Sequence, residues 1–196
     1  MNTSAVILAA GNSSRMGQPK MLLSYRGKTL LQHVTDEVLA ASISPVVVVT
    51  GAESNAVQDS LLTGSVYFVQ NEHWQEGMAA SIRAGVDTIT AAGPALDAVV
   101  VLVCDQPFVS ADLLQRMMLL KQQTGKGLIA CAYNDTTGTP VLFDKRYFAH
   151  LRQLEGQQGA KKLLKQFAED VATVDFPQGA TDIDTPGDYE RLLKSE

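Results

Sequence analysis

Four short runs of the chain are apolar at almost every position, and they limit the possible folds more than any other feature. The runs cover residues 5–10 (AVILAA), 46–50 (VVVVT), 66–69 (VYFV) and 98–103 (AVVVLV). A strand with one solvated face alternates apolar and polar residues, whereas a strand covered on both faces is apolar throughout. The runs therefore predict strands of a parallel sheet that is buried between two layers of helices.

The segments between and after these runs have the period of amphipathic helices. The residues that share a helical face are, in chain order, Leu30, Leu31, Val34 and Val38; Met78, Ile82, Val86 and Ile89; and Leu113, Leu114, Met117 and Met118. Ser110 occupies the N-cap position of the third helix, and Thr185-Pro186-Gly187-Asp188 predicts the start of a last helix that runs through Leu193. This alternation of strands and helices predicts a three-layer α/β/α sandwich with a mostly parallel sheet.

Length and composition fit a single domain that spans residues 1–196. The formal net charge is −5, and the Lys and Arg residues are scattered, which argues against a surface for nucleic acid. No apolar stretch approaches the ~20 residues that span a bilayer, and the first run is too short for a signal peptide. Cys104 and Cys131 lack metal-ligand or redox spacing and are expected to be reduced thiols. These features predict a cytoplasmic protein without membrane or nucleic-acid partners.

Polar residues and glycines follow the predicted strands at the points where the strands end. The segment Gly11–Lys20 follows the first strand, Thr50-Gly51 the second, Asn71 the third and Asp105 the fourth. Ligands of such sheets bind in the crevice beyond the carboxyl ends of the strands. We therefore expect these residues to face one site.

The segment Gly11–Lys20 has the composition of a phosphate-binding loop. Small residues up to Gly11 let a ligand approach backbone N–H groups that bind anions, and Arg15 and Lys20 add two cations. Five residues separate Gly11 from Gly17, so neither a Walker A loop nor the dinucleotide fingerprint G-x-G-x-x-G fits. A solvated turn with two unrelated basic residues is the alternative. The presence of both cations and the second glycine at a strand end favours the phosphate loop.

Asp105 is the candidate metal ligand that the residues themselves indicate. It lies at the exit of a buried strand, where an unpaired acid is costly. Phosphates bound in such a loop carry negative charge that is usually neutralised by Mg²⁺ held through one or two carboxylates. Helix capping is the alternative role for Asp105, but Ser110 is the better cap. The metal role is therefore favoured.

Several motifs, spread over nearly the whole chain, resemble those of one family. The loop L-A-A-G-x-S-x-R-M-G-x-x-K resembles the signature of the MobA-like NTP transferases, which include molybdenum-cofactor guanylyl- and cytidylyltransferases. Further resemblances are Asn71-x-x-Trp74-x-x-Gly77-Met78-x-x-Ser81, Cys104-Asp105-Gln106-Pro107, Gly138-Thr139-Pro140 and Asp182-Ile183-Asp184-Thr185-Pro186. Ala10 stands where the guanylyl branch has glycine, so the molybdopterin cytidylyltransferase (MocA-type) branch is the nearest. The chain departs from that branch at Gln157 and Lys161, where an acid and an arginine are usual.

The resemblance implies a Rossmann-like fold of the nucleotide-diphospho-sugar transferase type and a set of site residues. The implied catalytic residues are Arg15, Lys20 and Asp105. The second metal ligand beside Asp105 is Asp182 or Asp184, and Asp184 is favoured because it aligns with the polar residue before Thr-Pro in related chains. The implied nucleotide-binding residues are Leu8, Ala9, Ala10, Gly11, Arg15, Lys20, Thr50, Asn71 and Ser81.

The implied reaction is Mg²⁺-dependent transfer of CMP from CTP to the phosphate of molybdopterin, with release of pyrophosphate. Such in-line transfer depends on positioning and electrostatics and needs no protein nucleophile. A molybdoenzyme that receives the cofactor would be the protein partner. Two alternatives remain open: nucleotidyl transfer to a sugar or polyol phosphate, and a non-catalytic accessory protein that binds nucleotide or cofactor for molybdoenzyme maturation.

Overall fold

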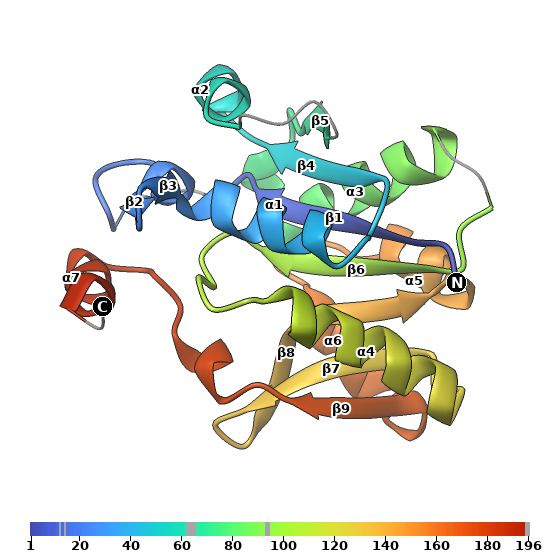
Figure 1. Ribbon diagram of the computed structural model, residues 1–196. Coiled ribbons are helices and arrows are strands. Elements are labelled where there is room, and N and C mark those ends of the chain that lie inside the picture. Colours follow the sequence, from blue (N-terminus) through green and yellow to red (C-terminus); the bar gives the residue numbers. More distant parts are fainter. Residues whose placement is uncertain (12, 14, 62–65, 93–94, 195–196) are drawn as a thin grey trace.

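A seven-stranded sheet forms the centre of the computed structural model (Figure 1), which describes residues 1–11, 13, 15–61, 66–92 and 95–194. The strands, in sheet order, are β5 (Val66–Gln70), β4 (Val46–Thr50), β1 (Thr3–Ala9), β6 (Ala98–Val103), β8 (Thr136–Asp144), β7 (Leu128–Tyr133) and β9 (Val171–Asp175). The four apolar runs are the adjacent, mutually parallel strands β5, β4, β1 and β6. β7 and β9 are parallel to each other, and β8 runs against both of its neighbours. The prediction of a mostly parallel sheet is confirmed.

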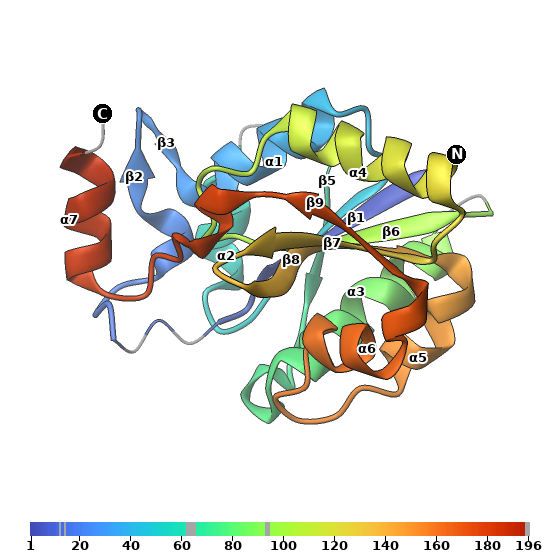
Figure 2. The same cartoon turned by 90° about the horizontal axis from the view of Figure 1, so that it is seen from below.

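Helices cover both faces of this sheet (Figure 2). One face carries α1 (Leu30–Ala40), α2 (Ser54–Asp59) and α4 (Ala111–Thr124), and the other carries α3 (Met78–Ala92), α5 (Phe148–Arg152) and α6 (Ala160–Gln166). Successive side chains of a strand point to opposite faces. Ile7 of β1 accordingly packs in the core beneath α1 and α4, whereas Val6 packs in the core beneath α3, and both are fully buried. Burial on two faces explains why β1, β4 and β6 are apolar throughout. The edge strand β5 is only partly buried, with Tyr67 55% exposed, so the prediction of burial on both faces is wrong for this strand. The predicted three-layer sandwich is confirmed.

The helix α3 approaches the sheet closely at Gly85. A Cβ atom at this position would lie 2.4 Å from Val6 Cγ1 and 3.0 Å from Val49 Cγ2. An interior glycine weakens a helix by about 1 kcal/mol relative to alanine, and here its lack of a side chain lets the helix backbone pack on β1 and β4. The first turn of α3 is thereby held near the carboxyl ends of these strands.

The predicted helix starts at Ser110 and Thr185 are confirmed. Ser110 Oγ accepts a hydrogen bond from Leu113 N at 3.2 Å. At the start of α7 (Pro186–Lys194), Asp188 Oδ2 accepts from Thr185 N at 2.7 Å, and Thr185 Oγ1 accepts from Asp188 N at 3.3 Å. This reciprocal pair is a capping box, which satisfies backbone donors that the helix leaves free.

A third, small core lies beside the main sheet. A hairpin of β2 (Ser24–Tyr25) and β3 (Lys28–Thr29) packs near α7, and Tyr189 Oη donates to Ser24 O at 2.5 Å (Figures 1 and 2). The buried side chains of this core are Met16, Leu23, Tyr25, Leu30, Ile183 and Leu192. The core therefore joins the segment that follows β1 to the last helix of the chain.

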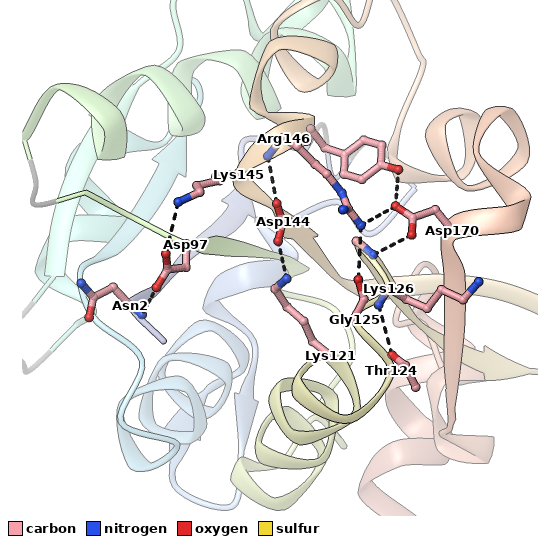
Figure 3. Close-up of polar contacts among 12 residues, drawn as sticks. Asn2, Asp97, Lys121, Thr124, Gly125, Lys126, Asp144, Lys145, Arg146 and Asp170 are labelled. Atoms are coloured by element: carbon pink, nitrogen blue, oxygen red, sulfur yellow. Dashed lines mark hydrogen bonds and ion pairs between the residues drawn. The ribbon is translucent and has the colours of Figure 1, made fainter.

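Charged side chains connect the elements at the amino ends of β6, β7 and β9 (Figure 3). Lys121 of α4 forms an ion pair with Asp144 at the end of β8. Three donors surround the carboxylate of Asp170, directly before β9: Tyr147 Oη at 2.6 Å, Arg146 Nη2 at 2.7 Å and Gly127 N at 3.1 Å. These charged side chains lie at the end of the sheet opposite to the carboxyl ends of β1 and β6, where the candidate site is expected. We therefore assign them a structural role.

We predict that Asp170 makes part of the stability sensitive to acid. Burial raises the pKa of Asp170, but the hydrogen bonds from Tyr147 and Gly127 and the charge of Arg146 outweigh this effect and hold the pKa below its ordinary value. A carboxyl group whose pKa is lower in the folded state stabilises the protein above its unfolded pKa of about 4, and this stability is lost as the pH falls through the folded pKa. Asp170→Asn should lower the free energy of unfolding at neutral pH by about 1–2 kcal/mol. It should also flatten the decline in stability below about pH 5, as measured by urea denaturation.

The matched control for this prediction is Asp112→Asn. The Asp112 side chain is 79% exposed and pairs with Arg116 on the surface of α4, so its replacement should leave the pH dependence unchanged. Parallel acid dependence in Asp170→Asn and the wild-type protein would contradict the prediction.

Candidate active site

The carboxyl ends of β1 and β6 bring the predicted charged residues together. Lys20 begins the short 3-10 turn η1 (Lys20–Leu22), and its Nζ lies 3.1 Å from Asp184 Oδ1 and also contacts Asp105 Oδ2. Arg15 Nη2 lies 3.3 Å from the other carboxylate oxygen of Asp184. Arg15, Lys20, Asp105 and Asp184, which come from three distant parts of the chain, thus form one charged cluster.

The loop between β1 and η1 is ordered by its own hydrogen bonds at Ser13. Lys20 N donates to Ser13 Oγ at 2.9 Å, and Met16 N donates to Ser13 O at 2.9 Å. Asn12 and Ser14, which belong to the predicted phosphate loop, lie outside the described residues. These two hydrogen bonds hold the loop backbone at Met16 and at Lys20.

Acidic groups surround the ammonium group of Lys20. Burial lowers the pKa of Lys20, but the charge of Asp105 and the hydrogen bonds that Lys20 donates to Asp105 and Asp184 raise it well above its ordinary value. Burial, together with the charges of Asp105 and Asp184, raises the pKa of Asp182 to about 6. Ile183 N donates to Asp105 O at 3.1 Å, so the acidic segment before α7 is fixed to the end of β6. The site concentrates negative charge around one largely buried cation.

Asp105 and Asp184 supply the oxygen ligands that Mg²⁺ and Mn²⁺ prefer. Oxygens of both carboxylates converge on the ammonium group of Lys20. Within the described residues, no group of three or more His, Cys, Asp or Glu side chains is arranged to hold a metal ion. Mg²⁺ commonly takes one or two carboxylates and completes its shell with water and substrate phosphates. A pair of carboxylates beside a phosphate loop therefore fits a divalent cation that binds together with a nucleotide.

A pocket of about 520 Å³ opens beside the charged cluster. Six of the predicted site residues line it: Leu8, Ala10, Gly11, Lys20, Ser81 and Asp105. A second pocket of about 310 Å³ extends along the loop past Ala9, and Trp74 forms part of the wall of both pockets. The larger pocket is within the size range of small-ligand sites and, as such sites usually are, mainly apolar, with a few polar groups.

Two predicted nucleotide-binding residues use their polar atoms inside the protein. Thr50 is fully buried, and its Oγ1 donates to Ser54 Oγ at 3.0 Å, so the structure does not place it in the lining of either pocket. Asn71 is also buried; its Nδ2 donates to Ser81 Oγ at 3.0 Å, and its Oδ1 accepts from His73 N at 3.0 Å. Asn71 therefore orders the turn before α3, and Ser81 is the member of this pair that reaches the pocket.

The turn before α3 adds pocket residues that the individual motifs do not identify as ligand contacts. Gln75, Gly77 and Met78 line the larger pocket together with Gln157. Gly77 has φ 114° and ψ −174°, and a Cβ atom on it would lie 2.5 Å from Gly156 O. Only glycine fits this backbone and this contact. Gly77 in the motif Asn71-x-x-Trp74-x-x-Gly77 is the sequence signal for this close contact. The motif does not indicate that the contacted residue is Gly156.

The two cysteines are free and buried. Cys104 lines the larger pocket, and burial together with the charge of Asp105 raises the pKa of its thiol to about 12. Burial likewise raises the pKa of Cys131 to about 12. Both side chains are therefore neutral thiols at physiological pH, so neither is a nucleophilic thiolate.

A loop with two cations, a pair of carboxylates and an adjoining pocket are features expected of a nucleotidyltransferase, and comparison with known proteins shows that the chain is of this class. The chain belongs to the MobA-like NTP transferase domain family, whose model matches residues 5–171. The chain is similar to nicotine blue oxidoreductase of Paenarthrobacter nicotinovorans, with 32% identity over 96% of this chain and 95% of that protein.

Solved structures share the fold over nearly the whole chain. A nucleotidyl transferase from Methanothermobacter is 27% identical, covers 98% of this chain and 96% of its own, and has a TM-score of 0.81. The structure of Rv0371c from Mycobacterium tuberculosis in complex with manganese is 28% identical, covers 100% of both chains, and has a TM-score of 0.80. The predicted nucleotide-diphospho-sugar transferase type of fold is confirmed. A divalent metal in a similar protein agrees with the donor set of Asp105 and Asp184. Among the described residues, no helix has the length and hydrophobicity needed to cross a membrane.

Proposed function

We propose that this nucleotidyltransferase moves CMP from CTP to the phosphate of molybdopterin and releases pyrophosphate, with Mg²⁺ as its metal. The observation that carries the reaction class is the convergence of Arg15, Lys20, Asp105 and Asp184 in one charged cluster. Lys20 and Asp105 of this cluster line the larger pocket. The preference for CTP and molybdopterin rests on the resemblance of the loop, with Ala10 in place of glycine. We further propose that residues 1–196 act as one unit in the cytoplasm and deliver the product to a molybdoenzyme.

The charged residues have distinct parts in this reaction. Arg15 and Lys20 bind the triphosphate and stabilise charge on the leaving pyrophosphate. Asp105 and Asp184 would hold the metal, which neutralises phosphate charge when bound. An oxygen of the acceptor phosphate forms a bond to the α-phosphorus of CTP, and the bond from that phosphorus to the bridging oxygen of pyrophosphate breaks. The chain positions both reactants, and no covalent enzyme intermediate is required.

One departure from the cytidylyltransferase pattern favours a second candidate acceptor. Gln157 lines the pocket at a position where that branch usually has an acid. Lys161 follows at the start of α6 in place of the usual arginine. A changed pocket wall favours nucleotidyl transfer to a sugar or polyol phosphate as the alternative function.

A pyrophosphate-release screen tests these functions directly. Each of the four nucleoside triphosphates is combined with molybdopterin, a sugar phosphate or a polyol phosphate in the presence of Mg²⁺. We expect CTP with molybdopterin to exceed every other pair by at least about tenfold in kcat/KM. Faster release with a sugar or polyol phosphate would support the alternative acceptor. Nucleotide binding without release from any pair would instead support a non-catalytic accessory protein.

A further inference from the structure

The two cations of the predicted phosphate loop are already paired with carboxylates of the same chain. The Lys20 side chain is only 16% exposed, and its ammonium group contacts both Asp105 and Asp184. Arg15, which is 68% exposed, pairs with the second oxygen of Asp184. The groups expected to bind phosphates are therefore held by the groups expected to bind the metal.

A divalent cation and the ammonium group of Lys20 compete for the same carboxylate oxygens. If Lys20 stays in place, a metal ion on Asp105 and Asp184 would meet a like charge within the distance of a hydrogen bond. Such close like charges repel strongly in a partly buried site. The ammonium group must leave the carboxylates when the metal binds.

The ammonium group of Lys20, rather than the carboxylates of Asp105 and Asp184, is the group expected to move. Asp105 follows a central strand, and the hydrogen bond from Ile183 N to Asp105 O at 3.1 Å ties the segment of Asp184 to it. Lys20 has a flexible four-carbon side chain, and it lines the larger pocket. A displaced Lys20 ammonium group therefore turns from the two carboxylates, whose backbones are held together, toward the pocket, where the proposed triphosphate lies.

We propose that Lys20 is an internal counter-ion that closes the metal site in the free protein and becomes a phosphate ligand when a divalent cation displaces it. This inference rests on the proposed nucleotidyltransferase function. Metal alone must compete with Lys20 and binds weakly. Metal with triphosphate binds well, because the displaced ammonium group gains phosphate oxygens in exchange for its carboxylates. Metal and nucleotide consequently strengthen each other's binding.

Replacement of Lys20 by methionine separates this model from a simple loss of function. Binding of Mn²⁺ to the full chain is measured by electron paramagnetic resonance, first without nucleotide. The Lys20→Met variant should bind Mn²⁺ at least about tenfold more tightly than the wild-type protein, although it loses a residue of the active site. Addition of CTP should tighten Mn²⁺ binding at least about tenfold in the wild-type protein and much less in the variant.

Controls keep the outcomes distinct. Lys28→Met removes a 53% exposed lysine that pairs with Asp36, and it should bind Mn²⁺ as the wild-type protein does. Lys20→Gln serves as a second neutral variant if Lys20→Met does not fold. Equal or weaker Mn²⁺ binding by the folded Lys20 variant would overturn the inference. Because this measurement needs no acceptor and no turnover, the inference and the proposed acceptor can fail independently.

Discussion

Asp105→Asn is expected to lower the rate of nucleotidyl transfer by about 10²–10³-fold while the protein remains folded. The substitution removes a negative charge from the point where β6 meets the phosphate loop, and with it one of two carboxylates that contact Lys20. Arg15 and Lys20 remain to bind phosphates, so nucleotide affinity should change far less than the rate. Initial rates of pyrophosphate release at saturating Mg²⁺ and nucleotide measure the effect.

The control for this prediction removes a carboxylate of the same kind elsewhere. Asp112→Asn lies on the exposed face of α4 and should leave the rate within about twofold of the wild-type value. Retention of more than about a tenth of the rate by Asp105→Asn would contradict a role for this carboxylate in the transition state.

Gly77→Ala should lower kcat/KM by about 10–100-fold, chiefly through weaker nucleotide binding. Its φ of 114° and ψ of −174° lie in a region that is essentially restricted to glycine and costs other residues about 1–3 kcal/mol. The new Cβ atom would also lie 2.5 Å from Gly156 O and 2.9 Å from Gln157 Cδ. One side of the larger pocket must therefore shift away from the other.

Gly125→Ala is the matched control for this substitution. Gly125 also has a positive φ, 68°, but a Cβ atom on it would meet nothing within 4 Å. It ends α4, away from the pocket. We expect Gly125→Ala to lower the melting temperature slightly and to leave kcat/KM unchanged. Equal losses of kcat/KM in the two variants would show that backbone strain alone, without the contact to Gly156, explains the effect.

Local sequence patterns predict the four parallel strands β5, β4, β1 and β6. β4 is valine at four successive positions, a pattern that few other environments explain. β8 contains Gly138 and Pro140 among threonines, and this composition resembles a loop as much as a strand. Its antiparallel pairing with β6 and β7 is a long-range choice that no local pattern encodes. The hairpin of β2 and β3 is likewise too short to give a periodic signal.

The residues of the candidate site also differ in how well the sequence alone predicts them. Lys20 and Asp105 are predictable because each follows a strand of the central sheet, whose carboxyl ends meet at one edge. Asp184 lies 164 positions from Lys20, and the family resemblance, rather than any local pattern, indicates it. Position at a strand end was insufficient for Thr50, because side chains at a strand end point to either face and its hydroxyl group turns into the protein. The contact of Gly77 with Gly156 depends on how the start of α3 packs against the segment between α5 and α6, which spacing does not reveal.

The small core of Met16, Ile183 and Leu192 has a consequence for the synthesis of the protein. A ribosome makes the phosphate loop early and the last helix late. Until Ile183 and Leu192 emerge, the core around Met16 is incomplete, and Arg15 and Lys20 lack Asp184. A nascent chain that has completed its central strands still has an unfinished catalytic centre. The site is therefore complete only after translation has passed Leu192.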